Sequence, residues 1–359
     1  MTGPAAPGRR SPALPRGAVA LRTRGASLLL RPRSAAVAAV CAVVALAAGT
    51  VALGVGDYPV PLGDVPAALT GRAGPVPAHV VTEMRLPRVA TGLGAGAAFG
   101  VSGAVFQRVL RNPLVSPDVI GVNAGASAGA VLVITLAGGA TAPTVAGALA
   151  GAAAATLLGY LVARRDGISG YRLVLVGIGV TALATALTSV LLTRAELHDV
   201  QRASIWLTGS LANRGWAHAA AVAAALVLLA PLLAALGRRL RLLELGDDLA
   251  RSLGAAPEPA RAGLLAAAVV LAAVGTAVAG PVAFVALVAP QIVRRLVADR
   301  TAGLAASGAC GALLVVAADL AARLVFAPVE LPVGVLTAVF GAPFLLALLV
   351  RAHRGGRAG

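Results

Sequence analysis

Long apolar stretches, separated by short connections, constrain the fold of this chain more than any other feature. An unbroken run such as 217–236 is long enough to cross the roughly 30 Å hydrocarbon core of a bilayer as a helix, and it lacks the alternation of a transmembrane β-strand. Of the 359 residues, 58% are hydrophobic and only 12% are charged. The sequence therefore predicts an all-α, polytopic membrane bundle. About ten spans are expected, at residues 35–55, 89–108, 119–137, 142–163, 172–193, 217–236, 261–279, 282–297, 303–325 and 333–350.

The arginines predict the orientation of this bundle. With the N-terminus inside, arginine pairs and clusters fall on alternate connections, which the positive-inside rule places in the cytoplasm. The other connections hold single arginines and acidic residues such as Glu196 and Asp199, and the first of them, residues 56–88, is expected to be an external loop with at most short helices. A multi-pass protein of the cell membrane with both termini cytoplasmic is expected. The cytoplasmic connections would contain Arg108 and Arg111, Arg164 and Arg165, Arg238, Arg239 and Arg241, Arg294, Arg295 and Arg300, and Arg351 and Arg354.

The two ends of the chain are expected to lie outside the membrane. Residues 1–34 contain seven arginines and no acidic residue, which predicts a disordered basic tail in the cytoplasm. Residues 35–351 would form the transmembrane domain, and residues 352–359 a second cytoplasmic tail. A cleaved signal peptide with residues 35–48 as its apolar core is an alternative. The long basic segment before it favours an uncleaved first span.

Composition also excludes several kinds of chemistry. The chain contains no lysine, so it lacks the residue that a P-loop sets against nucleotide phosphates, and no ATP-hydrolysing site of its own is expected. Cys41 and Cys310 sit singly in apolar runs and the four histidines are scattered, so neither a metal site nor a cofactor is predicted. Aromatic residues make up only 3% and the arginines gather at helix ends, which favours membrane lipid over nucleic acid as a partner.

One acidic residue, Asp319, lies within the predicted spans, and Arg323 follows it one turn later. Residues four apart share a helix face, so the two side chains can neutralise each other. A structural pair is favoured over a proton relay, because a relay usually needs several carboxylates or histidines in the membrane.

Residues 85–129 contain the most distinctive pattern. Two apolar stretches rich in glycine and alanine flank a polar elbow at 111–118, where Pro113 and Pro117 should end the preceding helix. Asp118 is placed to cap the next helix. Small residues at helical spacing predict close packing of helix backbones. They are Gly92, Gly96, Gly100 and Gly103 before the elbow, and Gly121, Gly125 and Gly129 after it.

The motifs Arg85-Leu86-Pro87-Arg88, Ser102-Gly103-Ala104-Val105-Phe106-Gln107, Arg111-Asn112-Pro113-Leu114 and Gly121-Val122 resemble the FecCD family, the permeases of ABC importers for iron chelates, haem and cobalamin. Residues 280–295 and 329–343 are similar to later signatures of the family. Gln291 stands where members commonly have histidine, and a packing role is expected for it. The resemblance implies structural roles for Gly103, Gln107, Asn112, Pro113, Gly121, Gly280, Pro281, Pro290, Glu330, Pro332, Gly334, Gly341 and Pro343.

The resemblance implies a type II ABC importer permease. Such a chain would pair with a second permease subunit, the same or related, and with separate ABC ATPase subunits that use the ATP. It would take its substrate from a lipid-anchored or periplasmic binding protein. A ferric siderophore is the expected cargo, with haem or cobalamin as alternatives. A secondary carrier driven by an ion gradient and a membrane-embedded signalling or scaffold subunit are the rival functions.

Two sites follow from the residues and from the resemblance. Leu242, Leu245, Leu249 and Leu253 form an apolar stripe in the polar segment 242–254, which predicts docking on a membrane surface or in a groove of a partner. The resemblance implies that this segment couples to the ATPase, and that permease arginines dock the binding protein, although the first two of them could instead anchor a helix at lipid head groups. The coupling residues would be Leu245, Gly246, Asp247, Asp248, Leu249, Arg251 and Gly254, and the docking residues Arg85, Arg88 and Arg323. In the coupling segment, the two glycines are expected to set the turns, and Asp247, Asp248 and Arg251 to pair with the ATPase.

Overall fold

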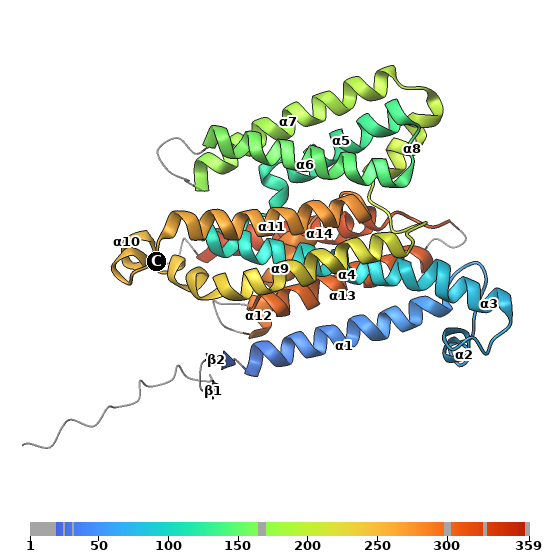
Figure 1. Cartoon of the computed structure of the whole chain (residues 1–359), viewed down its shortest axis with the longest axis horizontal. Coiled ribbons are helices and arrows are strands. Elements are labelled where there is room, and N and C mark those ends of the chain that lie inside the picture. Colours follow the sequence, from blue (N-terminus) through green and yellow to red (C-terminus); the bar gives the residue numbers. More distant parts are fainter. Residues whose placement is uncertain are drawn as a thin grey trace, which may run out of the picture.

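The long helices of the chain lie side by side and run between two ends of the molecule (Figure 1). The computed structural model describes residues 19–23, 26–30, 32–163, 170–297, 303–325 and 329–355. Within these ranges, seven helices are long and apolar enough to cross a membrane, and two shorter apolar helices accompany them. The predicted all-α polytopic bundle is therefore confirmed. The seven are α1 (Pro32–Gly54), the continuous helix Pro75–Val109, α6 (Thr141–Ala163), α7 (Gly170–Arg194), α9 (Trp216–Leu243), α11 (Pro257–Ala279) and α13 (Leu304–Leu324); the shorter two are α5 (Val122–Ala137) and the apolar part of α14 (Val333–Gly355).

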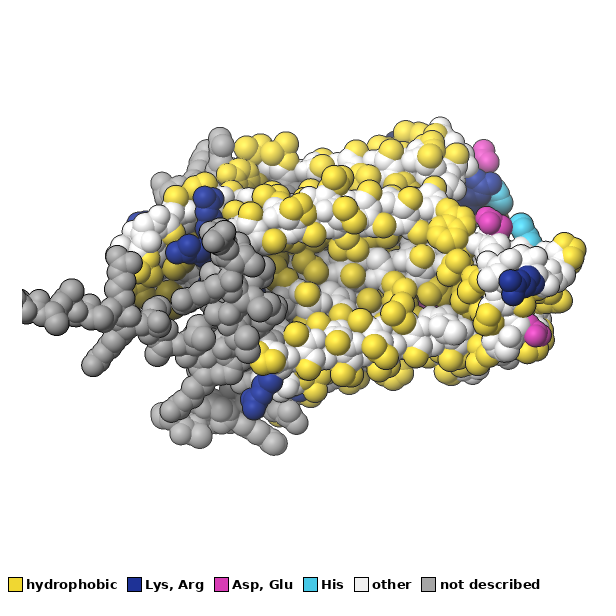
Figure 2. Space-filling view, turned by 60° about the horizontal axis from the view of Figure 1, so that its bottom comes forward, with side chains coloured by type: hydrophobic (Ala, Val, Ile, Leu, Met, Phe, Trp, Pro, Cys, Tyr) yellow, Lys and Arg dark blue, Asp and Glu magenta, His cyan; other side chains and the backbone are white. Residues whose placement is uncertain are grey.

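The two ends of the molecule differ in their side chains. The short helix α10 (Asp247–Ser252) marks one end, called here the α10 end, and α8 (Leu197–Leu207) marks the other, called the α8 end. The start of α1 and the last residues of α14 both lie at the α10 end (Figure 1). Figure 2 shows apolar side chains over the middle of the molecule, arginines at both ends, and the visible carboxylates and histidines at the α8 end.

Helix α4 (Leu86–Val109) is the centre of the bundle and packs against α13, α11, α12 (Val285–Val297) and α9. Its glycines make this possible, because a Cβ on Gly96 or Gly100 would overlap the backbone of α13, and one on Gly103 would overlap the carbonyl oxygen of Ala286 in α12. Where lipid removes the hydrophobic drive between helices, such close backbone contact holds them together. The predicted packing role of the glycine spacing is confirmed.

Gly103→Ala is expected to lower the free energy of unfolding by about 3 kcal/mol or more, because the new methyl group must push α4 away from α12. The matched control is Gly179→Ala in α7, where a Cβ meets no atom within 4 Å. It should be neutral or should stabilise the helix by up to about 1 kcal/mol. Thermal unfolding of both variants in detergent measures the difference, and similar melting temperatures would contradict the packing account.

The segment before α4 is more helical than predicted. Residues 56–88 were expected to form an external loop with short helices, but after α2 (Val65–Leu69) a continuous helix runs from Pro75 through α3 (Pro75–His79) and η1 (Val80–Arg85) into α4. Pro75 is tolerated because it opens the helix, where an N–H has no partner. Pro87 is tolerated because the turn before it is a wide π-helical turn.

The predicted span at 282–297 is wrong in length. The helix α12 begins at Val285 and has 13 residues, which corresponds to about 20 Å and is shorter than a bilayer core. The chain ahead of it is not helical, with φ of 76° at Gly280 and 65° at Phe284. The elbow also differs, because Asp118 makes no cap hydrogen bond. It lies instead in a 3₁₀ turn, Pro117–Ile120, and Gly121 with φ of 86° begins α5.

The terminal tails differ in part from expectation. Strands β1 (Val19–Thr23) and β2 (Ala26–Leu30) pair antiparallel, with Thr23 opposite Ala26, where a tail without regular structure was expected. Helix α14 continues to Gly355, past the predicted start of the C-terminal tail. Residues 1–18, Arg164, Arg165, Arg300 and 356–359 lie outside the described residues.

Candidate functional site

The turn between α9 and α11 presents a bare apolar face at the α10 end. Leu245, Leu249 and Leu253 are 54%, 50% and 57% exposed, although they belong to a segment of only two short turns. Glycines set the path of this segment, since Gly246 has φ of 104° and Gly254 has φ of 78°, a region that favours glycine. This geometry supports the turn role predicted for the two glycines.

Ion pairs hold the turn rigidly on the bundle. Asp247 accepts two hydrogen bonds from Arg261 of α11, at 2.7 and 3.0 Å, and Glu244 pairs with Arg108 of α4 at 2.6 Å. The hydrogen bond from Arg261 holds the pKa of the Asp247 carboxyl below its ordinary value. Asp247 was expected to pair with the ATPase, but the structure uses it inside the chain. The reason is the position of Arg261, 14 residues further along, which folding brings back to the turn.

Asp248 and Arg251 remain at the surface of the same turn. Their side chains are exposed and pair with each other at 3.1 Å. An exposed pair of this kind contributes little to stability, so both groups are available to a partner at small cost. The exposed leucines and this pair therefore form one surface, called here the coupling surface: Leu245, Asp248, Leu249, Arg251 and Leu253.

A buried hydrogen-bond network lies on the bundle side of this end. Gln291 of α12 donates through Nε2 to Oε1 of Gln107 and, at 2.9 Å, to the carbonyl oxygen of Pro113 in the elbow. Gln107 in turn donates to the carbonyl oxygen of Leu287 at 3.0 Å. A packing role was expected for Gln291, and the structure adds these hydrogen bonds to it. Its amide joins α12 to the end of α4 and to the elbow, which precede it in sequence by 184 and 178 residues.

The remaining signature residues have local structural contacts. A Cβ on Gly334 would overlap the carbonyl oxygen of Thr208, and one on Gly341 would overlap Phe284. Asn112 accepts a hydrogen bond from the backbone N–H of Leu114 at 3.0 Å. The other positions lie in turns or inside helices: Gly280 beside Gly209, Pro281 beside Gly209 and Gly334, Pro332 accepting from the N–H of Val335, Pro290 within α12 and Pro343 within α14.

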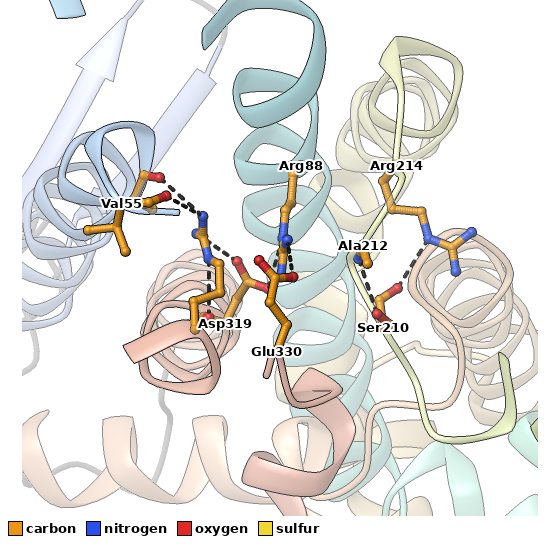
Figure 3. A network of polar contacts seen from close by, with 9 residues as sticks. Val55, Arg88, Ser210, Ala212, Arg214, Asp319 and Glu330 are labelled. Carbon is orange, nitrogen blue, oxygen red and sulfur yellow. Dashed lines mark hydrogen bonds and ion pairs between the residues drawn. The ribbon is translucent and has the colours of Figure 1, made fainter. Parts of the chain in front are cut away.

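A charged cluster lies at the α8 end, where α4, α13 and the start of α14 meet (Figure 3). Asp319 accepts from Arg88 and from Arg323, each at 2.9 Å. Arg88 also reaches Glu330 at 2.8 Å, and Arg323 donates to the carbonyl oxygens of α1 and the residues after it, Ala52 and Val55. The predicted pair of Asp319 and Arg323 is confirmed.

The three arginines predicted to dock a partner are all engaged inside the chain. Arg85 is 8% exposed and donates to the carbonyl oxygens of Leu53 at 2.8 Å and Tyr58 at 2.6 Å. Arg88 and Arg323 are held by Asp319, as described above. All three are therefore hydrogen-bonded within the chain while they line the surface at this end, and their docking role stays a prediction. Their partners come from α1 and α13, which sequence spacing alone does not place beside α4.

An open pocket that the sequence does not indicate lies beside this cluster. The pocket has a volume of about 400 Å³ and contains a fourth arginine, Arg214, from the connection between α8 and α9. Nothing in the sequence marked Arg214 beyond its place in that connection. The charged side chains that line the pocket are Asp57, Glu83, Arg85, Arg88, Arg214, Arg323 and Glu330.

The bundle of apolar helices, with an apolar surface at one end and a charged pocket at the other, defines a polytopic integral membrane protein. The model of the FecCD transport family matches residues 42–351, and the chain belongs to this family.

Similar proteins agree with this assignment. The ferric enterobactin transport system permease protein FepG of Escherichia coli (strain K12) is 44% identical over 288 residues, which cover 80% of this chain and 87% of FepG. The achromobactin transport system permease protein CbrC of Dickeya dadantii (strain 3937) is 40% identical over 277 residues, covering 76% and 79%. A solved structure described as an inward-facing, metal-chelate type ABC transporter matches with a TM-score of 0.78 at 27% identity, covering 88% of this chain and 99% of that one.

Proposed function

We propose that this chain is the permease subunit of an ATP-driven importer, in which ATP is hydrolysed by separate ABC ATPase subunits. The coupling surface supports this most directly, because it exposes three leucines on a turn that ion pairs hold in place. Such a surface suits a groove on a partner. The chain itself would perform no chemistry and need no cofactor. The domain layout would be a basic N-terminal segment within 1–34, the permease at 35–351 and a C-terminal segment at 352–359, with α1 and α14 extending a few residues past the two boundaries.

The orientation of the chain in the membrane and its remaining partners follow from the same proposal. The α10 end would face the cytoplasm with both termini, since arginines dominate the connections there. The α8 end would receive a lipid-anchored or periplasmic binding protein. A second permease subunit, the same chain or a related one, would complete the substrate path between the two subunits.

A ferric siderophore is the proposed cargo. FepG carries ferric enterobactin in its name and CbrC carries achromobactin, and the solved neighbour is described as a metal-chelate type transporter. The iron would arrive inside its chelate, so the permease would need no metal ligands of its own. Haem and cobalamin remain the alternative cargoes.

The proposal is tested by reconstitution in vesicles with the ATPase subunits and the binding protein. Uptake of radioactive ferric enterobactin, ferric achromobactin, haem or cobalamin is measured with and without ATP. ATP-dependent uptake of a ferric siderophore is expected, and vesicles with this chain alone should accumulate nothing. Accumulation by the chain alone on a proton or sodium gradient would overturn the proposal, and uptake of haem or cobalamin alone would overturn the cargo.

A further inference from the structure

The last turns of α9 carry three arginines that have no acidic partner. Arg238, Arg239 and Arg241 all lie exposed at the surface, and within the part of the chain that the structure describes none of them makes an ion pair. The carboxylates of the turn beyond α9 and of the first turn of α11 are already paired with other arginines: Glu244 with Arg108, Asp247 and Glu258 with Arg261, and Asp248 with Arg251. The end of α9 therefore has three uncompensated positive charges.

The same surface of α9 is apolar further back along the helix. Val227 lies eleven residues before Arg238 and Leu228 eleven before Arg239, a separation of about three helical turns that returns to the same face. Val227 and Leu228 are 71% and 72% exposed, and Leu232 lies exposed between Leu228 and Arg239. Because α9 is long and apolar enough to cross a membrane, these exposed side chains suit contact with hydrocarbon. Each stripe of apolar surface then ends at an arginine.

The length of α9 places the arginines at the level of lipid head groups. The rise from Trp216, where the helix begins, to Arg238 is about 33 Å at roughly 1.5 Å per residue. This matches the hydrocarbon core of a bilayer, which is about 30 Å thick. Trp216 is exposed, and tryptophan is enriched where hydrocarbon meets the head groups. With Trp216 at one face of the bilayer, the three arginines lie beside the phosphates of the opposite leaflet.

The arrangement of the three side chains favours a shared anion. Arg238 and Arg241 are three residues apart and lie on one face of the helix, where like charges destabilise each other. A phosphate between them would relieve this repulsion, and a guanidinium can bind a phosphate through two parallel hydrogen bonds. A Cβ on Gly237, next to Arg238, would meet no atom within 4 Å. Open space for a head group therefore lies beside the arginines.

We propose that Arg238, Arg239 and Arg241 bind the head group of an anionic phospholipid, such as phosphatidylglycerol, in the leaflet at the α10 end. The guanidinium groups donate to the phosphate, and the acyl chains lie along the exposed apolar stripes of α9. A zwitterionic lipid binds more weakly, because its own ammonium group already accompanies the phosphate. Neither the ATPase nor a transported substrate takes part in this binding. The coupling surface begins shortly after Arg241, so the bound lipid holds the end of the helix that leads into it.

Binding is measured on the purified full-length chain in neutral detergent, by native mass spectrometry with added phosphatidylglycerol or phosphatidylcholine. The wild type should retain phosphatidylglycerol in preference to phosphatidylcholine. The double variant Arg238→Gln, Arg239→Gln should bind phosphatidylglycerol about 25-fold more weakly, since each arginine near an anionic lipid surface contributes about fivefold. The matched control is Arg72→Gln, Arg194→Gln, which removes two exposed arginines away from the α10 end. This control should bind both lipids as the wild type does.

Three outcomes would overturn the inference. The first is unchanged affinity of the Arg238→Gln, Arg239→Gln variant for phosphatidylglycerol, in which case the arginines serve another partner such as the ATPase. The second is an equal loss in the control pair, which would mean that overall charge alone attracts the lipid. The third is displacement of the lipid by inorganic phosphate at equal concentration, which would indicate a site for a soluble anion. Equal melting temperatures of the two double variants exclude unfolding as the cause of a difference. No ATPase or binding protein is present, so the result is independent of the proposed function.

Discussion

Asp319→Asn is expected to lower the free energy of unfolding by about 3–5 kcal/mol, the range observed when one member of a buried ion pair is removed. Asp319 is shared by Arg88 and Arg323, and the side chain of Arg323 is only 3% exposed. Asparagine keeps the volume of the side chain, so the variant removes the charge alone. Two guanidinium groups are then left without their common counter-charge. Thermal unfolding of the purified protein in detergent measures the loss.

Glu330→Gln is the matched control, because Glu330 also pairs with Arg88 but its side chain is 36% exposed. A partly exposed pair of this kind contributes about 1 kcal/mol or less, so this variant should unfold near the wild-type temperature. Comparing the two variants tests whether the stabilising effect of these ion pairs depends on their burial. Equal melting temperatures for Asp319→Asn and Glu330→Gln would contradict the account given above.

Leu249→Asp is expected to abolish ATPase-driven transport while leaving the chain folded. Leu249 is half exposed on the coupling surface, so a carboxylate there stays in water in the isolated chain. In the assembled complex it would occupy an apolar groove. Losing one buried leucine contact costs about 1.5–3 kcal/mol, and burying an unpaired charge adds more. Association with the ATPase should therefore weaken by at least about a hundredfold, as measured by co-purification and by ATP hydrolysis in vesicles.

The control for this variant carries the same change at the opposite end. Leu69→Asp alters a leucine of α2 that is 45% exposed and far from the coupling surface (Figure 1). It should copurify with the ATPase as the wild type does. Normal ATPase association by Leu249→Asp would show that the exposed leucines serve another purpose, for example contact with lipid.

Local pattern in the sequence determined much of the fold. The apolar runs predicted the helical bundle because a helix satisfies its own backbone hydrogen bonds in lipid. Glycine spacing predicted the close contacts of α4, since the need for a small residue depends on the helix period. The turns at the glycines of the coupling segment and the ion pair of Asp319 and Arg323 could also be predicted, because each depends on residues that are near neighbours in the chain.

The first and last residues of some helices could not be predicted from the sequence. Whether a segment such as 282–297 crosses fully depends on what its first residues pack against, and hydropathy does not report this. The α12 helix begins late because Gly280 and the residues after it run beside Gly209 and Gly334. The predicted span at 89–108 likewise began too late, because the helix already runs from Pro75 and passes Pro87 through a π-helical turn.

Only the tertiary structure decided which charged residues are committed and which are free. Arg88 meets Asp319, 231 residues away in sequence, and Arg261 returns to Asp247. Arginines that the sequence does not distinguish therefore have different partners in the fold. Arg88 and Arg323 share one carboxylate and Arg261 fixes a turn, whereas Arg214 has no carboxylate partner among the described residues. A helix period can place residues three or four apart, but it carries no information about which distant helix lies opposite. Packing of the whole bundle fixes that choice, and with it the assignment of each charge.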